Sequence, residues 1–231
     1  MRVWRYLNYL VREKWWGALY PTYVFVRSRC TGTTVVHVVG DSHTQAFFRR
    51  YPFIVHHLGA ATAYNLASAR STTNSGKQLF QIASSLNHNR EMLLLVFGEI
   101  DCRIHIYKRY RELNGAKTIL SLIKATVRKY GKAMEKLAGQ HIPFAVLSAS
   151  PAGRQKNIYG YPYYATFAKR AEIVKRFNKE LAAYCREHGY RYADLYREVV
   201  NANGGIKRAY RQDEVHLNAN VVPIVKKLLR L

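Results

Sequence analysis

One stretch of the chain, Thr34-Val-Val-His-Val-Val-Gly-Asp-Ser-His43, indicates how the protein folds. Its β-branched run, Thr34–Val39, is typical of a buried strand, and the glycine and aspartate after it are residues that favour turns. The residues that follow, as far as Arg50, have a helical pattern. A strand that passes through a tight turn into a helix predicts the start of an α/β unit.

The same alternation of strand and helix continues to the end of the chain. Further strands are predicted at Phe53–Leu58, Met92–Phe97, Ile142–Leu147 and Tyr190–Leu195. Helices are predicted at Gly76–Asn87, Ala116–Ala138, Phe167–His188 and Ala219–Leu231. This order predicts one α/β domain over residues 32–231, with a parallel sheet and helices on both of its faces. Ligands bind beyond the carboxyl ends of such strands, which here are Gly40–Ser42, Gly59, Gly98–Asp101 and Ser148–Pro151.

A basic, amphipathic segment, residues 1–31, precedes this domain. Residues 1–29 hold six Lys and Arg against one Glu, with an apolar helical stripe formed by Val3, Leu7, Leu10, Val11 and Trp15. It is not a secretory signal, because it has no unbroken apolar centre and no small-residue cleavage site. Two interpretations stay open: a helix packed on the domain, or a helix that contacts a membrane surface.

Composition narrows the function classes without choosing one. The 231 residues include 37 Lys and Arg against 14 Asp and Glu, so the formal net charge is +23. The longest apolar run, Met92–Phe97, is far shorter than the roughly 20 residues of a membrane-spanning helix. The charge is compatible with nucleic acid, an anionic membrane surface or an anionic substrate. No zinc-finger spacing or RNA-binding aromatic signature is present, and the basic residues are spread along the whole chain, so charge alone does not decide. Nucleic acid becomes unlikely because the scarce acids stand at the candidate catalytic positions and a basic run directly follows the third predicted strand.

The cysteines predict a compartment. Cys30, Cys102 and Cys185 are odd in number and lack metal-ligand spacing, which indicates free thiols in a reducing environment and no bound metal. We therefore expect a cytoplasmic protein, peripheral to the inner membrane surface if residues 1–29 bind it.

The first candidate for chemistry is the turn Gly40-Asp41-Ser42-His43, which holds one of the chain's four aspartates. A serine there can simply cap a helix. Alternatively its hydroxyl faces the binding edge, where backbone N–H groups can stabilise an oxyanion. The turn is not the G-x-S-x-G elbow of other serine hydrolases, because Thr44 stands where the second glycine would be.

The second candidate is Asp213-Glu-Val-His216, just before the last predicted helix. Serine is a weak nucleophile that needs a base, usually a histidine oriented by a carboxylate. The three-residue spacing lets the Asp213 carboxylate reach the Nδ1–H of His216, which leaves Nε2 for a serine hydroxyl. An ordinary surface histidine is the alternative interpretation.

Together the motifs resemble those of the SGNH (GDSL-like) hydrolase superfamily. Gly40–His43 resembles its first block with the usual leucine replaced by histidine, and Gly59 follows the second strand, where the family keeps an oxyanion-hole glycine. Gly98–Asp101 resembles its Gly-x-Asn-Asp block and Asp213–His216 its closing Asp-x-x-His. The resemblance implies a flavodoxin-like three-layer α/β/α sandwich with a five-stranded parallel sheet. It also implies ester hydrolysis or acyl transfer without metal or organic cofactor, with Ser42 as nucleophile, His216 as base and Asp213 orienting it.

One departure affects the oxyanion hole. The family's third block supplies an asparagine side chain, and this chain has Ile100, which has no donor. Candidates to replace it are Asn65, Asn74 and Arg103, and Gly76 could take the place of Gly59. The predicted oxyanion and substrate-binding residues are therefore Gly59, Asp41, Glu99, Asp101, Arg103 and Asn74. Alternatively, Glu99 and Asp101 hold Arg103 in place as a structural ion pair.

Two groups of residues bear on the substrate. A basic run follows the third predicted strand, at Arg103, His105, Lys108, Arg109 and Arg111, and favours an anionic substrate unless it is a solvated face. Tyr159, Tyr161, Tyr163 and Tyr164 form either an aromatic wall for sugar rings or a packed loop. We therefore expect a serine esterase acting on an acylated, anionic glycan or similar substrate. The alternatives are an O-acyltransferase and a non-catalytic protein that binds glycans or anions.

Overall fold

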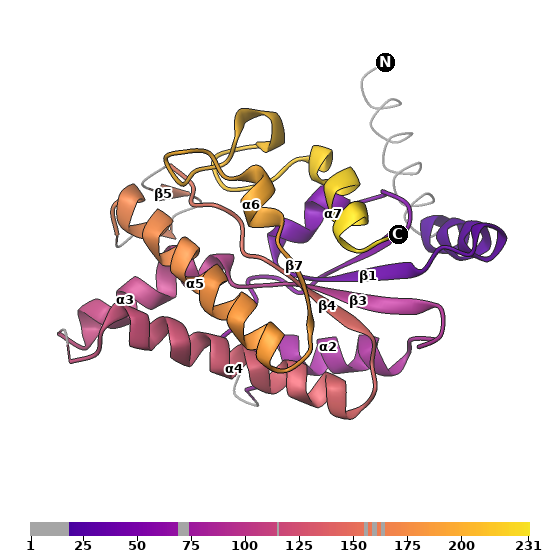
Figure 1. Ribbon diagram of the computed structural model, residues 1–231, viewed down its shortest axis with the longest axis horizontal. Helices are drawn as coiled ribbons and strands as arrows, with labels where there is room; N and C mark the ends of the chain where they lie inside the picture. Colours follow the sequence, from indigo (N-terminus) through magenta and orange to yellow (C-terminus); the bar gives the residue numbers. More distant parts are fainter. Residues whose placement is uncertain (1–18, 69–73, 115, 155–156, 159–160, 163–164) are drawn as a thin grey trace, which may run out of the picture.

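The five predicted strands form one parallel sheet. A computed structural model describes residues 19–68, 74–114, 116–154, 157–158, 161–162 and 165–231 (Figure 1). The strands are β1 (Val35–Gly40), β2 (Phe53–His57), β3 (Glu91–Val96), β4 (Phe144–Leu147) and β7 (Arg191–Ala193). Their order is β2-β1-β3-β4-β7 and all pairs are parallel, which is the flavodoxin-like order. The predicted sheet is thereby confirmed.

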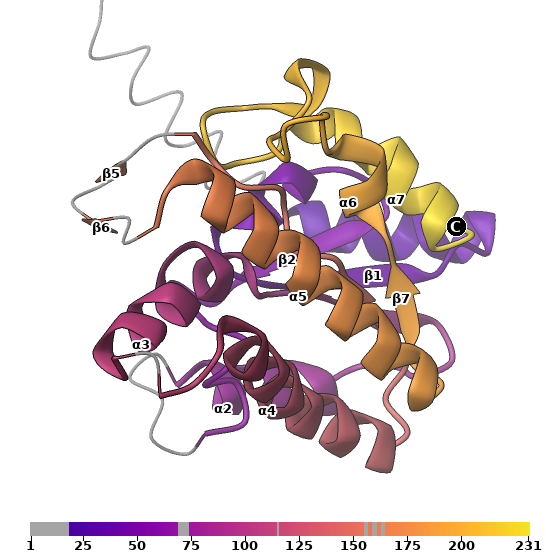
Figure 2. The same cartoon turned by 60° about the vertical axis from the view of Figure 1, so that its left-hand side comes forward.

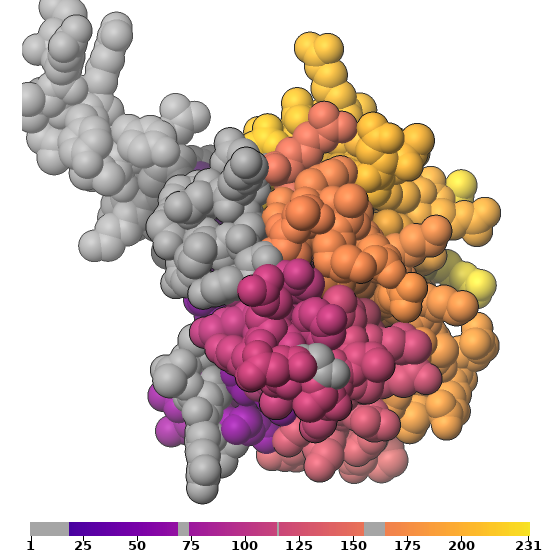
Figure 3. Space-filling view, turned by 90° about the vertical axis from the view of Figure 1, so that its left-hand side faces the viewer, coloured from indigo at the N-terminus to yellow at the C-terminus, as the bar shows by residue number. Residues whose placement is uncertain are grey.

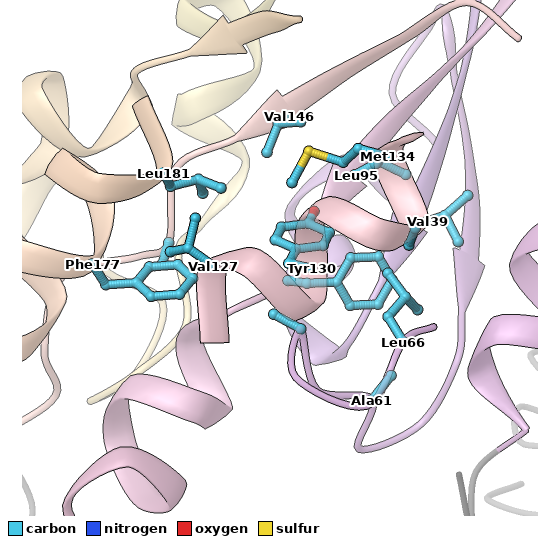
Figure 4. Packing of buried hydrophobic residues seen from close by; sticks show 14 of the residues in the cluster. Val39, Ala61, Leu66, Leu95, Val127, Tyr130, Met134, Val146, Phe177 and Leu181 are labelled. Atoms are coloured by element: carbon cyan, nitrogen blue, oxygen red, sulfur yellow. The ribbon is translucent and has the colours of Figure 1, made fainter. Parts of the chain in front are cut away.

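Helices cover both faces of this sheet, so the domain is the predicted three-layer sandwich. One face carries α2 (Ser75–Ser84), α4 (Ile119–Gly139) and α5 (Phe167–Glu187), and the other carries α6 (Leu195–Val199) and α7 (Val222–Leu228). Figure 4 shows the larger core, where Tyr130 and Met134 of α4 lie among Val39, Leu95 and Val146 of the strands. The long helices begin where threonine side chains accept an N–H of the first turn, Thr118 for α4 and Thr166 for α5.

Several short elements differ from the predictions. The helical stretch after β1 is a 3-10 helix, η1 (Ser42–Phe47), that ends before Arg50. The basic run is itself helical: a π-helix, η2 (Asp101–His105), leads into α3 (Ile106–Glu112). Short 3-10 turns, η3 (Arg208–Tyr210) and η4 (Ala219–Val221), flank the Asp213–His216 segment. These elements are too short for their apolar spacing to be read as a helical period.

A small hairpin was also not predicted. Strands β5 (Asn157–Ile158) and β6 (Tyr161–Pro162) pair antiparallel after β4. Figure 2 shows this hairpin at the same end of the molecule as α3, which follows β3. Two-residue strands carry no alternation that sequence could reveal. Because the hairpin follows the carboxyl end of β4, it lies at the edge of the sheet where ligands bind in this class of fold.

The N-terminal segment is described from residue 19 onward, and residues 19–31 are helical. Val24 of this helix packs against Val35 and Ile54 near the other end of the sheet, while Leu19, Tyr23 and Val26 are exposed. The predicted stripe from Val3 to Trp15 lies outside the described residues. Within the described part, no helix is both long and apolar enough to cross a membrane. All three cysteines are free, and Cys102 and Cys185 are buried.

Candidate active site

The turn after β1 brings Ser42 to the carboxyl end of the sheet. Gly40 is needed there because a Cβ atom would lie 2.0 Å from the Val96 carbonyl oxygen of β3. The backbone N–H of Thr44 and its hydroxyl both donate to the Asp41 carbonyl, at 3.1 and 2.9 Å. The close approach of β1 to β3 and this tight turn together leave the Ser42 side chain half-buried at the start of η1.

His216 reaches Ser42 from 174 residues away in the chain. Its Nε2 lies 2.9 Å from Ser42 Oγ, and its Nδ1 lies 2.7 Å from Asp213 Oδ2. Because the carboxylate can only accept, Nδ1 carries a hydrogen, so Nε2 of the neutral ring is free to accept the serine proton. These three side chains form a continuous hydrogen-bonded chain with the geometry of a nucleophile, a base and its orienting acid.

The Asp213 carboxylate is organised by its own turn. Its Oδ1 accepts the backbone N–H groups of Val215 and His216 at 2.9 and 2.8 Å. Burial works to raise the pKa of Asp213, but these N–H donors and the His216 imidazole outweigh burial and hold the pKa below its usual value. The carboxylate therefore stays ionised and keeps the imidazole of His216 in the orientation that faces Ser42.

Solved structures share this architecture at low sequence identity. A GDSL-like lipase from Bacteroides thetaiotaomicron is 17% identical, with a TM-score of 0.57 over 93% of this chain and 96% of that one. An acetyl xylan esterase is 16% identical, with a TM-score of 0.51 over 84% of this chain and 97% of that one. No model of a known protein family matches the chain, and neither does any curated protein.

The chain has the GDSL-like (SGNH) hydrolase fold. The resemblance noted in the sequence is confirmed at the level of the fold, over most of the chain. In this fold the carboxyl ends of β1, β2 and β3 lie side by side, and they bring the remaining predicted site residues to one edge. Figure 3 views the molecule from that edge, where α3, the start of α5 and the C-terminal segments meet.

Two backbone N–H groups of the GDSL-like fold are available for an oxyanion. The N–H of Leu58 donates to the Gly40 carbonyl at 2.8 Å, so Gly59 stands beside the turn that carries Ser42. Gly59 is exposed, with a φ of +70° that favours glycine. In the described part of the chain, no protein acceptor is bonded to the N–H of Ser42 or of Gly59. Ile100 is buried and apolar, so it offers no third donor.

The acidic residues of the third block support the structure. Glu99 is buried with its Oε1 3.3 Å from the Nε atom of Arg103. The Asp101 carboxylate accepts the backbone N–H groups of Ala63 and Tyr64 at 2.7 and 3.2 Å and thereby holds the loop after β2. Burial raises the pKa of Asp101 to about 6 against these two hydrogen bonds, which lower it. This placement suits the structural alternative for Glu99 and Arg103 and does not suit substrate contact by Asp101.

The candidate donors from the loop after β2 have no described link to Ser42. Asn74 is exposed and stands before α2 in a left-handed conformation. Asn65 is also exposed, and its N–H contacts the Thr62 hydroxyl at 3.4 Å. A Cβ atom on Gly76 would lie 2.2 Å from the Leu66 carbonyl, so this glycine serves close packing. Within the described residues, no hydrogen bond joins any of the three to the Ser42 turn.

In the basic run after β3, which was predicted to favour an anionic substrate, the structure shows a structural role for Arg109. The Arg109 guanidinium lies 3.6 Å from the centre of the Tyr64 ring, and Lys108 pairs with Glu112 at 3.7 Å on α3. Arg109 therefore supports the loop that Asp101 holds. The proposed tyrosine wall cannot be placed, because Tyr159, Tyr163, Tyr164 and the side chain of Tyr161 lie outside the described residues.

The loop after β4 packs directly on the Asp213–His216 segment. A Cβ atom on Gly153 would lie 2.5 Å from Val215 Cγ1 and 2.6 Å from the Glu214 carbonyl oxygen. The loop is held by Arg170, whose buried guanidinium donates to the carbonyls of Gly153 and Ala165 at 2.8 and 2.5 Å. Sequence reasoning named neither residue, because nothing local marks a buried arginine in a basic helix.

The sequence did not predict how Asp41 and His43 interact on the turn that carries Ser42. Asp41 was predicted to contact substrate, but its side chain is buried and its Oδ1 accepts the backbone N–H and the Nδ1 of His43, both at 2.9 Å. The substitution of histidine for leucine in the first block was the sequence feature that could have revealed this contact.

Among the described residues, no group of three or more His, Cys, Asp or Glu side chains could hold a metal ion.

Proposed function

We propose that this protein is a serine esterase whose nucleophile is Ser42. The observation that carries the proposal is the hydrogen-bonded chain from Asp213 through His216 to Ser42, with distances of 2.7 and 2.9 Å. Such a chain converts a weakly nucleophilic hydroxyl into one that can attack a carbonyl. The GDSL-like fold, which the named lipase and acetyl xylan esterase share, supports the same assignment.

The reaction follows from which atoms can accept a proton. Ser42 Oγ bonds to the ester carbonyl carbon while its proton moves to His216 Nε2. The tetrahedral intermediate then breaks its bond to the leaving alcohol, which takes that proton. A water molecule attacks the acyl-serine, gives its proton to His216 and releases the acid, and Ser42 recovers its proton. Asp213 stabilises the imidazolium in both halves.

The oxyanion of each intermediate is bound by the N–H groups of Ser42 and Gly59 in this proposal. In the part of the chain that the structure describes, neither N–H has a protein acceptor, which supports the assignment. Ile100 supplies no third donor, and removing one donor from a comparable oxyanion hole costs about 10²–10³ in rate. We therefore expect slower turnover than in an enzyme with all three donors.

An acylated, anionic glycan is the substrate class we favour. The acetyl xylan esterase is named for an acetylated glycan, which supports a sugar ester. The net charge of +23 favours a negatively charged substrate over a neutral one. If a sugar hydroxyl replaced water as the attacking group, the same residues would perform O-acyl transfer.

The second candidate is a non-catalytic glycan- or anion-binding protein, and Ile100 is the observation that favours it. Both candidates are tested with p-nitrophenyl acetate turnover and with labelling by a fluorophosphonate, which reacts with activated serines. The variants are Ser42→Ala and, as the matched control, Ser84→Ala on the exposed end of α2.

An esterase requires turnover and labelling in the wild type and in Ser84→Ala, and loss of both in Ser42→Ala. Labelling that survives Ser42→Ala would overturn the assignment of the nucleophile. A folded wild-type protein that neither labels nor turns over any acetyl ester would favour the binding protein instead.

A further inference from the structure

His43 is a buried histidine that the proposed reaction does not use. It follows Ser42 directly in η1 and its side chain is 4% exposed. Its Nδ1 lies 2.9 Å from Asp41 Oδ1, and its Nε2 lies 3.0 Å from the carbonyl oxygen of Val215. Val215 is 172 residues further along the chain and immediately precedes His216. His43 therefore joins the turn that carries the serine to the segment that carries its base.

Both contacts require a hydrogen on the histidine. A carboxylate and a backbone carbonyl can only accept, so Nδ1 and Nε2 must both donate and the ring is an imidazolium. Burial works to lower the pKa of His43, but the Asp41 carboxylate, the nearby Glu99 and the Val215 carbonyl together raise it to about 9. The His216 ring, which is also titratable, faces His43 at 5.0 Å between ring centres.

The peptide groups of Val215 are held from two sides. Its N–H donates to Asp213 Oδ1 at 2.9 Å, and its carbonyl accepts from His43 Nε2 at 3.0 Å. The segment lies between η3 and η4 as a loop. The Gln212 N–H, which donates to the His216 carbonyl at 2.9 Å, and an antiparallel bridge between Arg211 and Leu217 close this loop. These bonds close the loop on itself and do not tie it to Ser42. Among the hydrogen bonds of the described residues, that of His43 links the loop to the Ser42 turn without involving the reacting side chains.

We propose that His43 is a positioning residue: its imidazolium, bonded to Asp41 and to the Val215 carbonyl, holds the His216 segment at hydrogen-bonding distance from Ser42. The proposal rests on the esterase function proposed above. Positioning of this kind matters because a displacement of about 1 Å in a catalytic group costs roughly 10² in rate. If His43 only filled space, an apolar side chain of similar size would serve equally well.

Two variants separate these roles. His43→Leu keeps apolar volume and removes both donors, whereas His43→Gln keeps an amide N–H near the position of Nε2 and cannot carry charge. We expect kcat for an acetyl ester to fall about 10²-fold in His43→Leu, with KM within threefold, and to recover to within about tenfold of wild type in His43→Gln. Wild-type kcat should also fall above about pH 9, as His43 loses its proton, and this fall should be absent in His43→Gln.

A folded His43→Leu protein that keeps kcat within threefold of wild type would overturn the proposal. If His43→Leu does not fold, the dependence of kcat on pH in wild type and in His43→Gln tests the proposal. A histidine that only fills space predicts the same kcat profile above pH 9 for both proteins, and that result would overturn the proposal.

An activity-independent measurement separates failure of this inference from failure of the esterase assignment. In ¹⁵N spectra of histidine-labelled Ser42→Ala protein at pH 7.5, both nitrogens of His43 should carry hydrogens. A neutral His43 would overturn the positioning role even in an active esterase. A protonated His43 in a protein that hydrolyses no ester would overturn the esterase and leave the contact intact.

Discussion

Asp101 illustrates how one buried carboxylate can make stability depend on pH. Among the described residues it accepts the backbone N–H groups of Ala63 and Tyr64, and burial raises its pKa to about 6. Between the unfolded pKa near 4 and this value, the folded protein binds more protons than the unfolded chain. The contribution of Asp101 to the free energy of unfolding therefore falls as pH rises from about 4 to about 6, by on the order of 3 kcal/mol.

This predicts a pH-dependent difference between wild type and Asp101→Asn. The asparagine loses one of the two N–H partners at every pH, so this loss is constant. The part of the stability difference that changes with pH then comes from the titration of Asp101 in wild type. Wild type should be more stable relative to the variant at pH 4 than at pH 7, as measured by chemical denaturation at both. The exposed control Glu112→Gln should show no such change. A constant difference between wild type and Asp101→Asn from pH 4 to 7 would show that the carboxylate titrates normally.

At this scale, sequence could predict contacts within a turn but not contacts across the fold. The three-residue spacing of Asp213 and His216 already implies that one can hold the other. The bonds from Asp101 to Ala63 and from His43 to Val215 span 38 and 172 residues. They exist only because the ends of neighbouring strands meet, which no local pattern encodes.

At the scale of elements, Gly153 controls how closely the loop after β4 packs on the His216 segment. A methyl group there would meet Val215 Cγ1 at 2.5 Å and the Glu214 carbonyl at 2.6 Å. Gly153→Ala should therefore displace the segment by a fraction of an ångström or more and lower kcat by about 10-fold to 10²-fold. The melting temperature should fall by only a few degrees.

The matched control is Gly139→Ala at the end of α4, where a Cβ atom meets nothing within 4 Å. This variant should leave kcat unchanged. Measuring both kcat and melting temperature for the two variants checks the prediction. Wild-type kcat in a folded Gly153→Ala protein would mean that the loop yields and the segment does not.

The helix of residues 19–31 is the element whose partner we propose to be an anionic membrane surface. Leu19, Tyr23 and Val26 are 52%, 42% and 59% exposed and follow helical spacing, with the basic Arg27 and Arg29 beside them. An exposed apolar stripe flanked by positive charge complements an anionic bilayer. The full chain should sediment with phosphatidylglycerol vesicles and not with phosphatidylcholine vesicles.

Val26→Asp should weaken this sedimentation at least several-fold, because it places a charge in the stripe. Leu113→Asp, an equivalent change at an exposed site after α3, should not. Equal binding by the two variants, or no binding by wild type, would contradict the membrane contact and favour a helix that serves the domain alone.

Helices and strands long enough to repeat their apolar spacing were predictable from the sequence, and the shorter ones were not. Strands β1 and β3 and helices α4 and α5 begin within about three residues of the predicted positions, because each is long enough to show its apolar spacing. The π-helix at Asp101–His105 lies in a stretch rich in charged residues. The burial of Cys102 and Ile104 could not be predicted from that pattern. The role of this π-helix in aiming Asp101 could be seen only in the folded chain.

At the scale of the whole molecule, the net charge of +23 should act on substrate capture. Long-range attraction accelerates the encounter with an anion and is screened by salt. The ratio of kcat/KM for an acetylated anionic glycan to that for a neutral acetyl ester should fall about tenfold between 20 mM and 500 mM salt. An unchanged ratio would exclude an anionic substrate. A steep salt dependence of binding to random duplex DNA would restore the nucleic-acid interpretation.

The two hydrogen bonds of the buried Arg170 have a consequence for how this protein can change over evolution. The Arg170 guanidinium binds the carbonyls of Gly153 and Ala165, which precede and follow the β5–β6 hairpin, and so fixes the chain on both sides of that hairpin. Doubling the length of a loop whose two ends are fixed costs only about 0.6 kcal/mol in loop entropy. The hairpin can therefore be lengthened, shortened or exchanged for that of another protein without moving the reacting groups, which makes it a natural site for acquiring a new specificity.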